Sequence, residues 1–202
     1  MRSICVLLMT LAAFSVACER NRDRADAQRE ASTSSTIGTS DLNRVSRTDK
    51  TFVRDIAIAE TAEIELSKLV PERSSNTEIK KFAQEMIDDH GKSMRSLKAL
   101  ADQYKVQVPA DLDSRRSRLR DKLAKLRAGD FDREYVDAIV DGHEEALDKL
   151  GARVDEENPV LPEKSDNAAT TSLNQWAATA YPAVRSHLEA AKALKTAIDK
   201  GR

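Results

Sequence analysis

Cysteine, glycine, proline and aromatic residues are all scarce in this chain. Of its 202 residues, 6 are glycine, 5 are proline and 4% are aromatic. So few turn-forming and aromatic residues argue against a sandwich or barrel of short strands and favour helices. The 2 cysteines, Cys5 and Cys18, both lie at the N-terminus. The rest of the chain therefore has neither a disulfide nor a thiolate metal site.

An excess of charge of one sign is also missing. The chain has 33 Lys and Arg and 34 Asp and Glu, for a net charge of −1. No overall field would recruit a polyanion, so no nucleic-acid partner is expected. The sequence also lacks nucleophile motifs and glycine-rich phosphate loops, so no catalytic residue is predicted and a non-enzymatic protein is expected.

The first 18 residues, MRSICVLLMTLAAFSVAC, have the pattern of an export signal. Arg2 precedes an apolar run over residues 4–16, which is short for a membrane span but typical of a signal-peptide core. Small residues then lead to Cys18, and the segment resembles a bacterial lipoprotein signal. The resemblance implies a lipid on Cys18 that attaches the protein to a membrane. Ser15, where lipoprotein signals usually have leucine, leaves simple secretion open as the alternative.

The stretch over residues 19–47 is polar and rich in Arg, Asp, Ser and Thr. It has almost nothing to bury, so it is predicted to be a disordered tether. By resemblance to bacterial sorting signals, Glu19 in place of an aspartate directly after Cys18 implies the outer membrane. The expected location is therefore the periplasm, with the folded domain at 48–200 anchored to the outer membrane.

Four long segments carry apolar residues at spacings of three and four, which place those residues on one face of a helix. The segments run from about Asp49 to Val70, Glu78 to Tyr104, Asp132 to Asp155 and Asp166 to Lys200. Helices with one apolar side cannot stand alone in water. The sequence therefore predicts an all-α domain in which an antiparallel four-helix bundle buries the four stripes.

Turn and capping residues suggest where the helices begin and end. Pro71 is predicted to end the first helix, and the residues 75–78 read as a capping box that opens the second. Gly129 is predicted to end a short helix before the third long one. Pro182 lies inside the last helix and predicts a bend there.

The short helix, at about residues 112–127, lies between the second and third long helices and is strongly basic. Its narrow apolar edge predicts an exposed helix lying across the bundle. Its arginines, among them Arg115, Arg116 and Arg118, leave a second interpretation open. In that interpretation they form a patch for an anionic envelope surface, such as lipid headgroups or polysaccharide.

One polar residue interrupts the apolar stripe of each long helix: Glu63, His90, His143 and His187. The 3 histidines are all that the chain contains. Three imidazoles and a carboxylate from four facing helices could hold a divalent transition metal, which is the candidate cofactor. The alternative is a polar layer in which buried histidines bond to carboxylates or to one another and fix the packing.

The position of Glu63 along the helix axis argues against the metal site. Counted from the turn near residue 73, Glu63 lies closer to the turn than His90, and the mismatch is roughly 10 Å at the helical rise unless the helices are staggered. Glu60, Glu85 and Asp89 are nearby carboxylates that could take its place.

A ferritin-type di-iron centre is not expected. Such a centre needs a Glu-x-x-His motif on each of two helices. The residues three positions before the histidines are instead apolar: Ile87, Val140 and Val184.

The segments DIAIAETAEIEL, FAQEMIDDH, FDREYVDAIVDGH and YPAVRSHLEAA contain the four polar residues. Together they resemble the DUF4142 domain family over about residues 48–197. The resemblance implies an exported bacterial protein, often a lipoprotein or outer-membrane protein, with a ferritin-like four-helix fold. It implies no reaction, because the function of the family is unsettled. An interaction module of the envelope, related to stress, is therefore the first expectation, and a metal-binding, possibly redox-active, protein is the alternative.

Overall fold

The computed structural model describes residues 44–201. The predicted signal peptide, Cys18 and the tether up to residue 43 lie outside these residues. The helices are α2 (Arg47–Ser67), α3 (Val70–Arg73), α4 (Thr77–Gln103), α5 (Ser114–Leu123), α6 (Ala128–Gly151) and α7 (Ala168–Lys200). Within residues 44–201 the only β-pairing is an isolated bridge between Val154 and Pro162. The predicted all-α class is therefore confirmed for this part of the chain.

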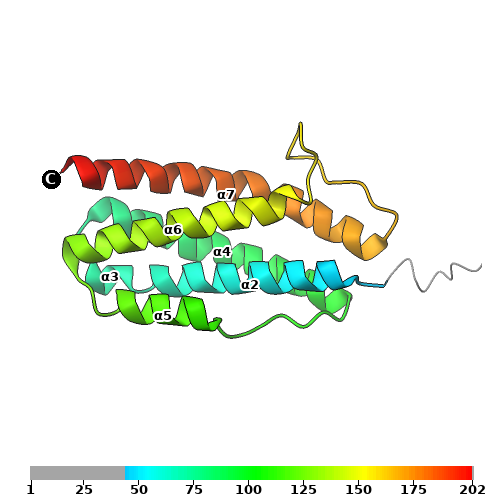
Figure 1. Cartoon of the computed structure of the whole chain (residues 1–202), viewed down its shortest axis with the longest axis horizontal. Coiled ribbons are helices and arrows are strands. Elements are labelled where there is room, and N and C mark those ends of the chain that lie inside the picture. Colours follow the sequence, from blue (N-terminus) through cyan, green and yellow to red (C-terminus); the bar gives the residue numbers. More distant parts are fainter. Residues whose placement is uncertain (1–43, 202) are drawn as a thin grey trace, which may run out of the picture. The chain divides into compact units, whose positions relative to one another are not determined.

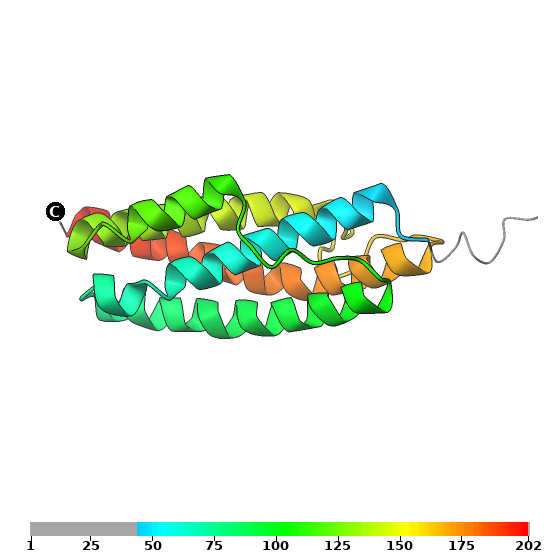
Figure 2. The ribbon, with the colours of Figure 1, turned by 90° about the horizontal axis from the view of Figure 1, so that it is seen from below.

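Helices α2, α4, α6 and α7 lie side by side along the long axis (Figures 1 and 2). Helix α2 packs against α4 and α6, and α7 packs against α6 and α4. Following the colours in Figure 1, α2 and α7 run in one direction and α4 and α6 in the other. The chain therefore returns along the helices between α4 and α6, and this return contains α5.

Several helix ends differ from those predicted. Pro71 does not end a helix but lies at the start of α3, where its missing N–H is not needed. Asn76, rather than Ser75, caps α4, because its side chain accepts from the backbone N–H groups of Glu78 and Ile79. Gly129 does not end a helix, since it lies in the first turn of α6.

Pro182 lies inside α7, as the sequence shows. Figure 1 shows α7 changing direction between its orange and red parts. A proline removes one backbone hydrogen bond and crowds the preceding turn, so a bend at this point has a local cause. The bend brings the second half of α7, which carries His187, along α6.

The buried apolar residues form two clusters. One contains Phe52, Ile56, Leu97, Leu150 and Leu173. The other contains Leu66, Phe82, Met86, Phe131, Tyr135 and Ile139. On each long helix, the polar residue of the stripe lies between the members of these two clusters. The polar residues therefore form a layer inside an otherwise apolar interior.

A buried ion pair joins α2 to the chain after α6. Arg153 Nη1 lies 2.7 Å from Asp49 Oδ1, and the guanidinium also lies 4.2 Å from the centre of the Phe52 ring. Asp49 accepts a further hydrogen bond from Thr170 of α7. Both charged side chains are buried, so the contacts within this group compensate for their lost hydration.

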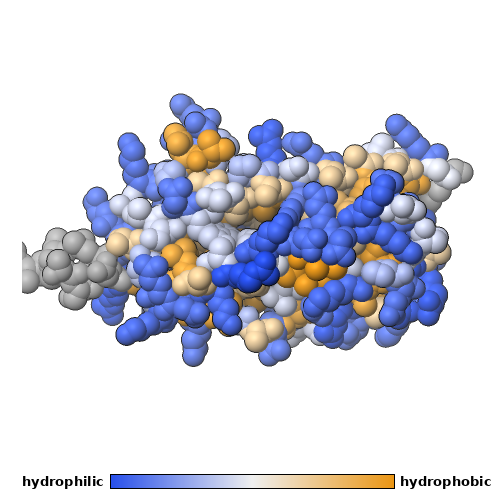
Figure 3. Space-filling model, turned by 180° about the vertical axis from the view of Figure 1, so that it is seen from behind, coloured by the Kyte–Doolittle hydropathy of each residue, from blue (hydrophilic) through white to orange (hydrophobic). Residues whose placement is uncertain are grey.

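The surface is mainly hydrophilic. Figure 3 shows one face on which charged side chains surround small hydrophobic areas, as is usual for exposed helix faces. None of the helices among residues 44–201 combines the length and the hydrophobicity that crossing a membrane requires.

Candidate functional site

The four polar residues of the apolar stripes converge in the interior. Glu63, His90, His143 and His187 are 5%, 4%, 0% and 5% exposed. The centres of the three imidazole rings lie 5.3, 5.4 and 5.6 Å apart. One ring nitrogen of each histidine lies within 4.8 Å of one nitrogen of each of the others. Side chains from four different helices therefore meet at one point.

Glu63 joins two of the histidines. Its Oε2 lies 3.1 Å from Nε2 of His90, and its Oε1 lies 3.1 Å from Nδ1 of His143. The mismatch in level expected from the sequence is therefore wrong. The count from residue 73 included residues 74–76, which are not helical, so the offset along the axis is smaller than that count implied. The glutamate side chain spans this offset.

The protonation of His143 follows from its surroundings. Its Nδ1 lies 3.0 Å from the carbonyl oxygen of Ile139 and also faces Glu63. Two acceptors at Nδ1 hold the proton on that nitrogen. In the neutral ring Nε2 then carries a lone pair, and it is buried with no hydrogen-bond partner among the described residues. In histidines that bind metals, the nitrogen that is not the ligand typically donates its N–H to a carboxylate or a backbone carbonyl, as Nδ1 of His143 can do here.

The other two histidines also have buried nitrogens without hydrogen-bond partners in residues 44–201. In His187 the nitrogen is Nδ1, while Nε2 lies 3.4 Å from Oδ2 of Asp89. In His90 both nitrogens lack a hydrogen bond, because the 3.1 Å contact of Nε2 with Glu63 is not aligned as one. Each histidine therefore offers a nitrogen that nothing described in the protein satisfies.

Burial and the charges of the site act on the same groups in opposite directions. Burial alone would raise the pKa of Glu63, but the neighbouring histidines, His143 first, lower it to about 2. Burial would lower the pKa of His143, but the Glu63 carboxylate raises it above its usual value. Burial lowers the pKa values of both His90 and His187. The site thus favours one ion pair, Glu63 with His143, and two neutral imidazoles.

Glu60 lies one turn before Glu63 and behaves differently. It is 6% exposed and accepts a short hydrogen bond from the Ser93 hydroxyl, while its Oε2 has no partner in the described residues. Burial, opposed by the Ser93 hydrogen bond and assisted by the charge of Glu63, raises the pKa of Glu60 to about 8. At neutral pH, Glu60 is therefore mainly an uncharged carboxylic acid beside the site.

A cavity leads to the site between α4 and α7. Its volume is about 430 Å3, and its walls include Glu60, His90, Ser93, Trp176 and His187. Two of the three histidines are therefore reached from the surface without passing through the apolar clusters. A small ion could enter by this route.

Gly142 is a part of the site that the sequence interpretation missed. A Cβ atom at this position would lie only 2.9 Å from Oε1 of Glu63. The absent side chain is thus what allows the carboxylate to approach α6 and contact His143. A glycine inside a helical stripe, directly before a buried histidine, was the available signal.

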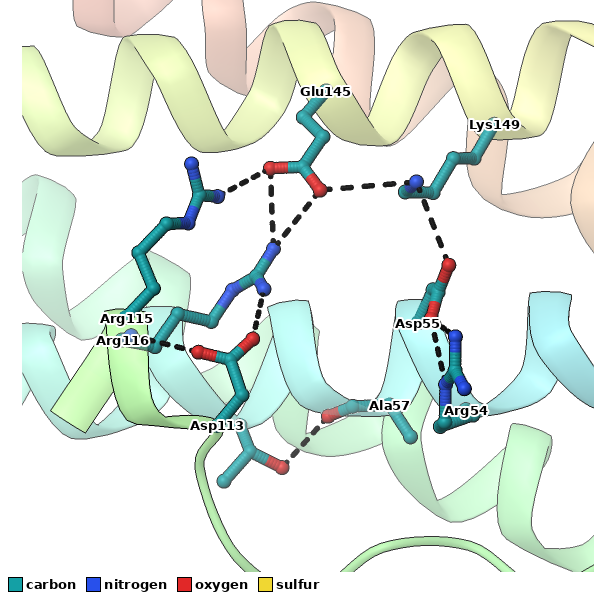
Figure 4. A network of polar contacts seen from close by, with 9 residues as sticks. Arg54, Asp55, Ala57, Asp113, Arg115, Arg116, Glu145 and Lys149 are labelled. Carbon is teal, nitrogen blue, oxygen red and sulfur yellow. Dashed lines mark hydrogen bonds and ion pairs between the residues drawn. The ribbon is translucent and has the colours of Figure 1, made fainter.

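Two arginines of the short basic helix, Arg115 and Arg116, are paired with carboxylates (Figure 4). Arg115 lies 2.6 Å from Glu145 of α6. Arg116 lies 2.6 Å from Asp113 and 3.2 Å from Glu145. Arg118 is exposed and has no ion pair with a described residue. Two of the three arginines in the predicted anionic-surface patch therefore attach α5 to α6.

Comparison with known proteins gives one family and one distant structure. The family described as "Domain of unknown function (DUF4142)" matches residues 34–194. A search of curated proteins finds no match. A crystal structure of a DUF305 protein from Streptomyces coelicolor, described as secreted, is 12% identical with a TM-score of 0.49, over 75% of this chain and 88% of that one.

Proposed function

The chain belongs to the DUF4142 family, a domain of unknown function, and on that premise we propose that it is an exported protein that binds one divalent transition-metal ion. The ligands are His90, His143, His187 and Glu63. The observation that carries the proposal is the group of three buried imidazoles, each with an unpartnered nitrogen, within 4.8 Å of one another and beside a carboxylate.

A polar layer that only fixes the packing explains fewer features of the site than a metal ion does. The pair of Glu63 and His143 places a carboxylate oxygen 3.1 Å from one ring nitrogen. It leaves the facing nitrogens of His90, His143 and His187 buried without hydrogen bonds among the described residues, and each such group costs about 1–3 kcal/mol. A metal ion would bind the lone pairs of His90 and His187 and, by displacing a proton, that of His143 Nε2, which favours metal binding over a structural layer.

The donor set suits zinc, copper or iron(II), since neutral imidazole is a preferred ligand for all three. The Glu63 carboxylate supplies charge compensation, and Asp89 and the Ile139 carbonyl are placed to orient His187 and His143. Since the three imidazoles each place one ring nitrogen within 4.8 Å of the others, the site suits one ion. The proposed role is to bind and hold the ion, and no residue is assigned to catalysis.

The wider setting is part of the proposal. Two antiparallel helix pairs with one long return, which contains α5, have the connectivity of a ferritin-like four-helix bundle. A signal peptide at 1–18, a lipid on Cys18 and a tether over 19–47 would anchor this bundle to the outer membrane on the periplasmic side. Membership of DUF4142 supports this setting, because the family resemblance implies export.

Zinc binding by protein purified without a histidine tag tests the proposal. After dialysis against zinc and then buffer, elemental analysis should find about one zinc per wild-type chain. His90→Ala, His143→Ala and His187→Ala should each retain much less. Tyr135→Phe is the control and should bind zinc normally. Tyr135 lies on the same buried face of α6 as His143, and the change removes only its hydroxyl group, which forms a hydrogen bond with Ser67 of α2. Negligible zinc in the wild type, or equal zinc in all variants, would reject the proposal.

A further inference from the structure

A wide groove lies between the first turns of α2, the last turns of α4 and the chain that follows α4. Its volume is about 990 Å3. Figure 2 shows that the chain leaving α4 crosses α2 on its way to α5. Five cationic side chains and one acidic side chain line the groove: Arg47, Lys50, Arg54, Lys98, Lys105 and Asp102. The excess of positive charge is local, because the whole chain has a net charge of −1.

Most of these cations have no counter-ion among the described residues. Arg54 pairs with Asp55 at 2.8 Å. No ion pair joins Arg47, Lys50, Lys98 or Lys105 to any residue between 44 and 201. Elsewhere on the same helices, lysines pair within their own helix, as Lys68 does with Glu65 and Lys81 with Glu78. Like charges gathered at a concave surface repel one another and raise the local potential, which an anion would relieve.

Lys105 has a backbone conformation that is unusual for a lysine. Lys105 follows α4 in the left-handed region, with φ of 56°, and the next residue, Val106, donates to the Ala101 carbonyl. Glycine is the usual residue at this position after a helix, because other residues are strained there. A lysine in the strained position adds a cation to the groove at a cost of about 1 kcal/mol. Such outliers gather at functional sites.

We propose that this groove binds a ligand carrying several phosphate groups. Lysine and arginine side chains are common phosphate-binding groups. None of the described residues that line the groove is aromatic, so they offer no platform on which nucleic-acid bases stack. Val106, Val108 and Pro109 form an apolar wall beside the cations. The ligand is either a soluble polyphosphate or the phosphorylated headgroup of a lipid.

Inorganic tripolyphosphate is the first probe. The protein is the full chain with Cys18→Ser, so that no lipid is attached to it, and binding is measured by calorimetry at low salt. Each cation that contacts phosphate should contribute roughly five-fold in affinity, so replacing both Lys50 and Lys98 by glutamine should weaken binding by about 25-fold. Lys80→Gln with Lys200→Gln removes the same charge elsewhere and should leave the affinity unchanged. Added salt should weaken binding of the wild type.

Vesicles distinguish the two sources of phosphate. The same proteins are mixed with vesicles of phosphatidylglycerol or of phosphatidylcholine, and sedimentation measures binding. Loss of phosphatidylglycerol binding in the Lys50 and Lys98 variant alone assigns the groove to lipid headgroups. Loss of tripolyphosphate binding without such a vesicle effect assigns it to a soluble ligand. If the groove variant and the control variant bind both probes equally, or the wild type binds neither, the proposal is wrong.

Discussion

Replacing Gly142 by alanine should weaken zinc binding while leaving the protein folded. The new Cβ would lie 2.9 Å from Oε1 of Glu63, whereas ordinary contacts begin at 3.4 Å. The carboxylate is the end of a flexible side chain, so it should retreat by about 0.5 Å, the difference between these two distances. Metal ligands tolerate displacements of only about 0.2 Å. We therefore expect the zinc affinity to fall by about 10–100-fold.

The free energy of unfolding should change little. Alanine is favoured over glycine inside a helix by about 0.5–1 kcal/mol, which offsets the weakened contact between Glu63 and His143. Gly91→Ala is the matched control, because it lies next to His90 and its Cβ would meet only Arg95 Nη1, at 3.6 Å. Competition with a chromogenic chelator measures zinc affinity, and urea unfolding measures stability. Wild-type zinc affinity in Gly142→Ala would refute the role of Glu63 as a ligand.

Three further predictions concern protonation and the buried ion pair. Because the pKa of Glu60 is raised from 4.5 to about 8, the folded protein should lose stability, by up to about 5 kcal/mol, as the pH rises from about 4.5 to 8. Glu60→Gln should remove this loss. Thermal melts of the wild type and Glu60→Gln at pH 5 and pH 8.5 measure it, and the same change in stability with pH in both proteins would contradict the prediction. Because the pKa of His143 is raised, protons should compete with zinc, so zinc affinity should fall as the pH drops; a flat profile between pH 5 and 8 would count against His143 as a ligand. Asp49→Ala leaves the buried Arg153 without its partner and should cost about 3–5 kcal/mol in urea unfolding, without changing zinc binding; a loss below 1 kcal/mol would show that the pair is dispensable.

The faces of the helices could be predicted from the sequence because they depend on one number, the period of the α-helix. Apolar residues at spacings of three and four identified the buried side of each helix. They also showed that His90, His143 and His187 lie on that side, where all three are buried. The all-α class followed from the same pattern. The convergence of the site was therefore a consequence of burying four stripes together.

Positions along the helix axis could not be predicted in the same way. They depend on where each helix begins, and residues 74–76, which the count from residue 73 included, lie outside the helices. The objection to Glu63 was wrong for this reason. Gly142 and the raised pKa of Glu60 depend on neighbours from other helices, which a single sequence does not place. The pairing of Arg115 and Arg116 with Glu145 likewise depends on how α5 packs on α6.

X-ray absorption spectroscopy of the zinc-loaded chain tests the central claim most directly. The expected spectrum shows one tightly bound zinc with three imidazole nitrogens and one carboxylate oxygen, all at about 2.0–2.2 Å. In His143→Ala the imidazole contribution should fall to two or the zinc should be lost. A chain that retains no zinc, or a spectrum that is the same in wild type and His143→Ala, would contradict the claim that these side chains form a metal site.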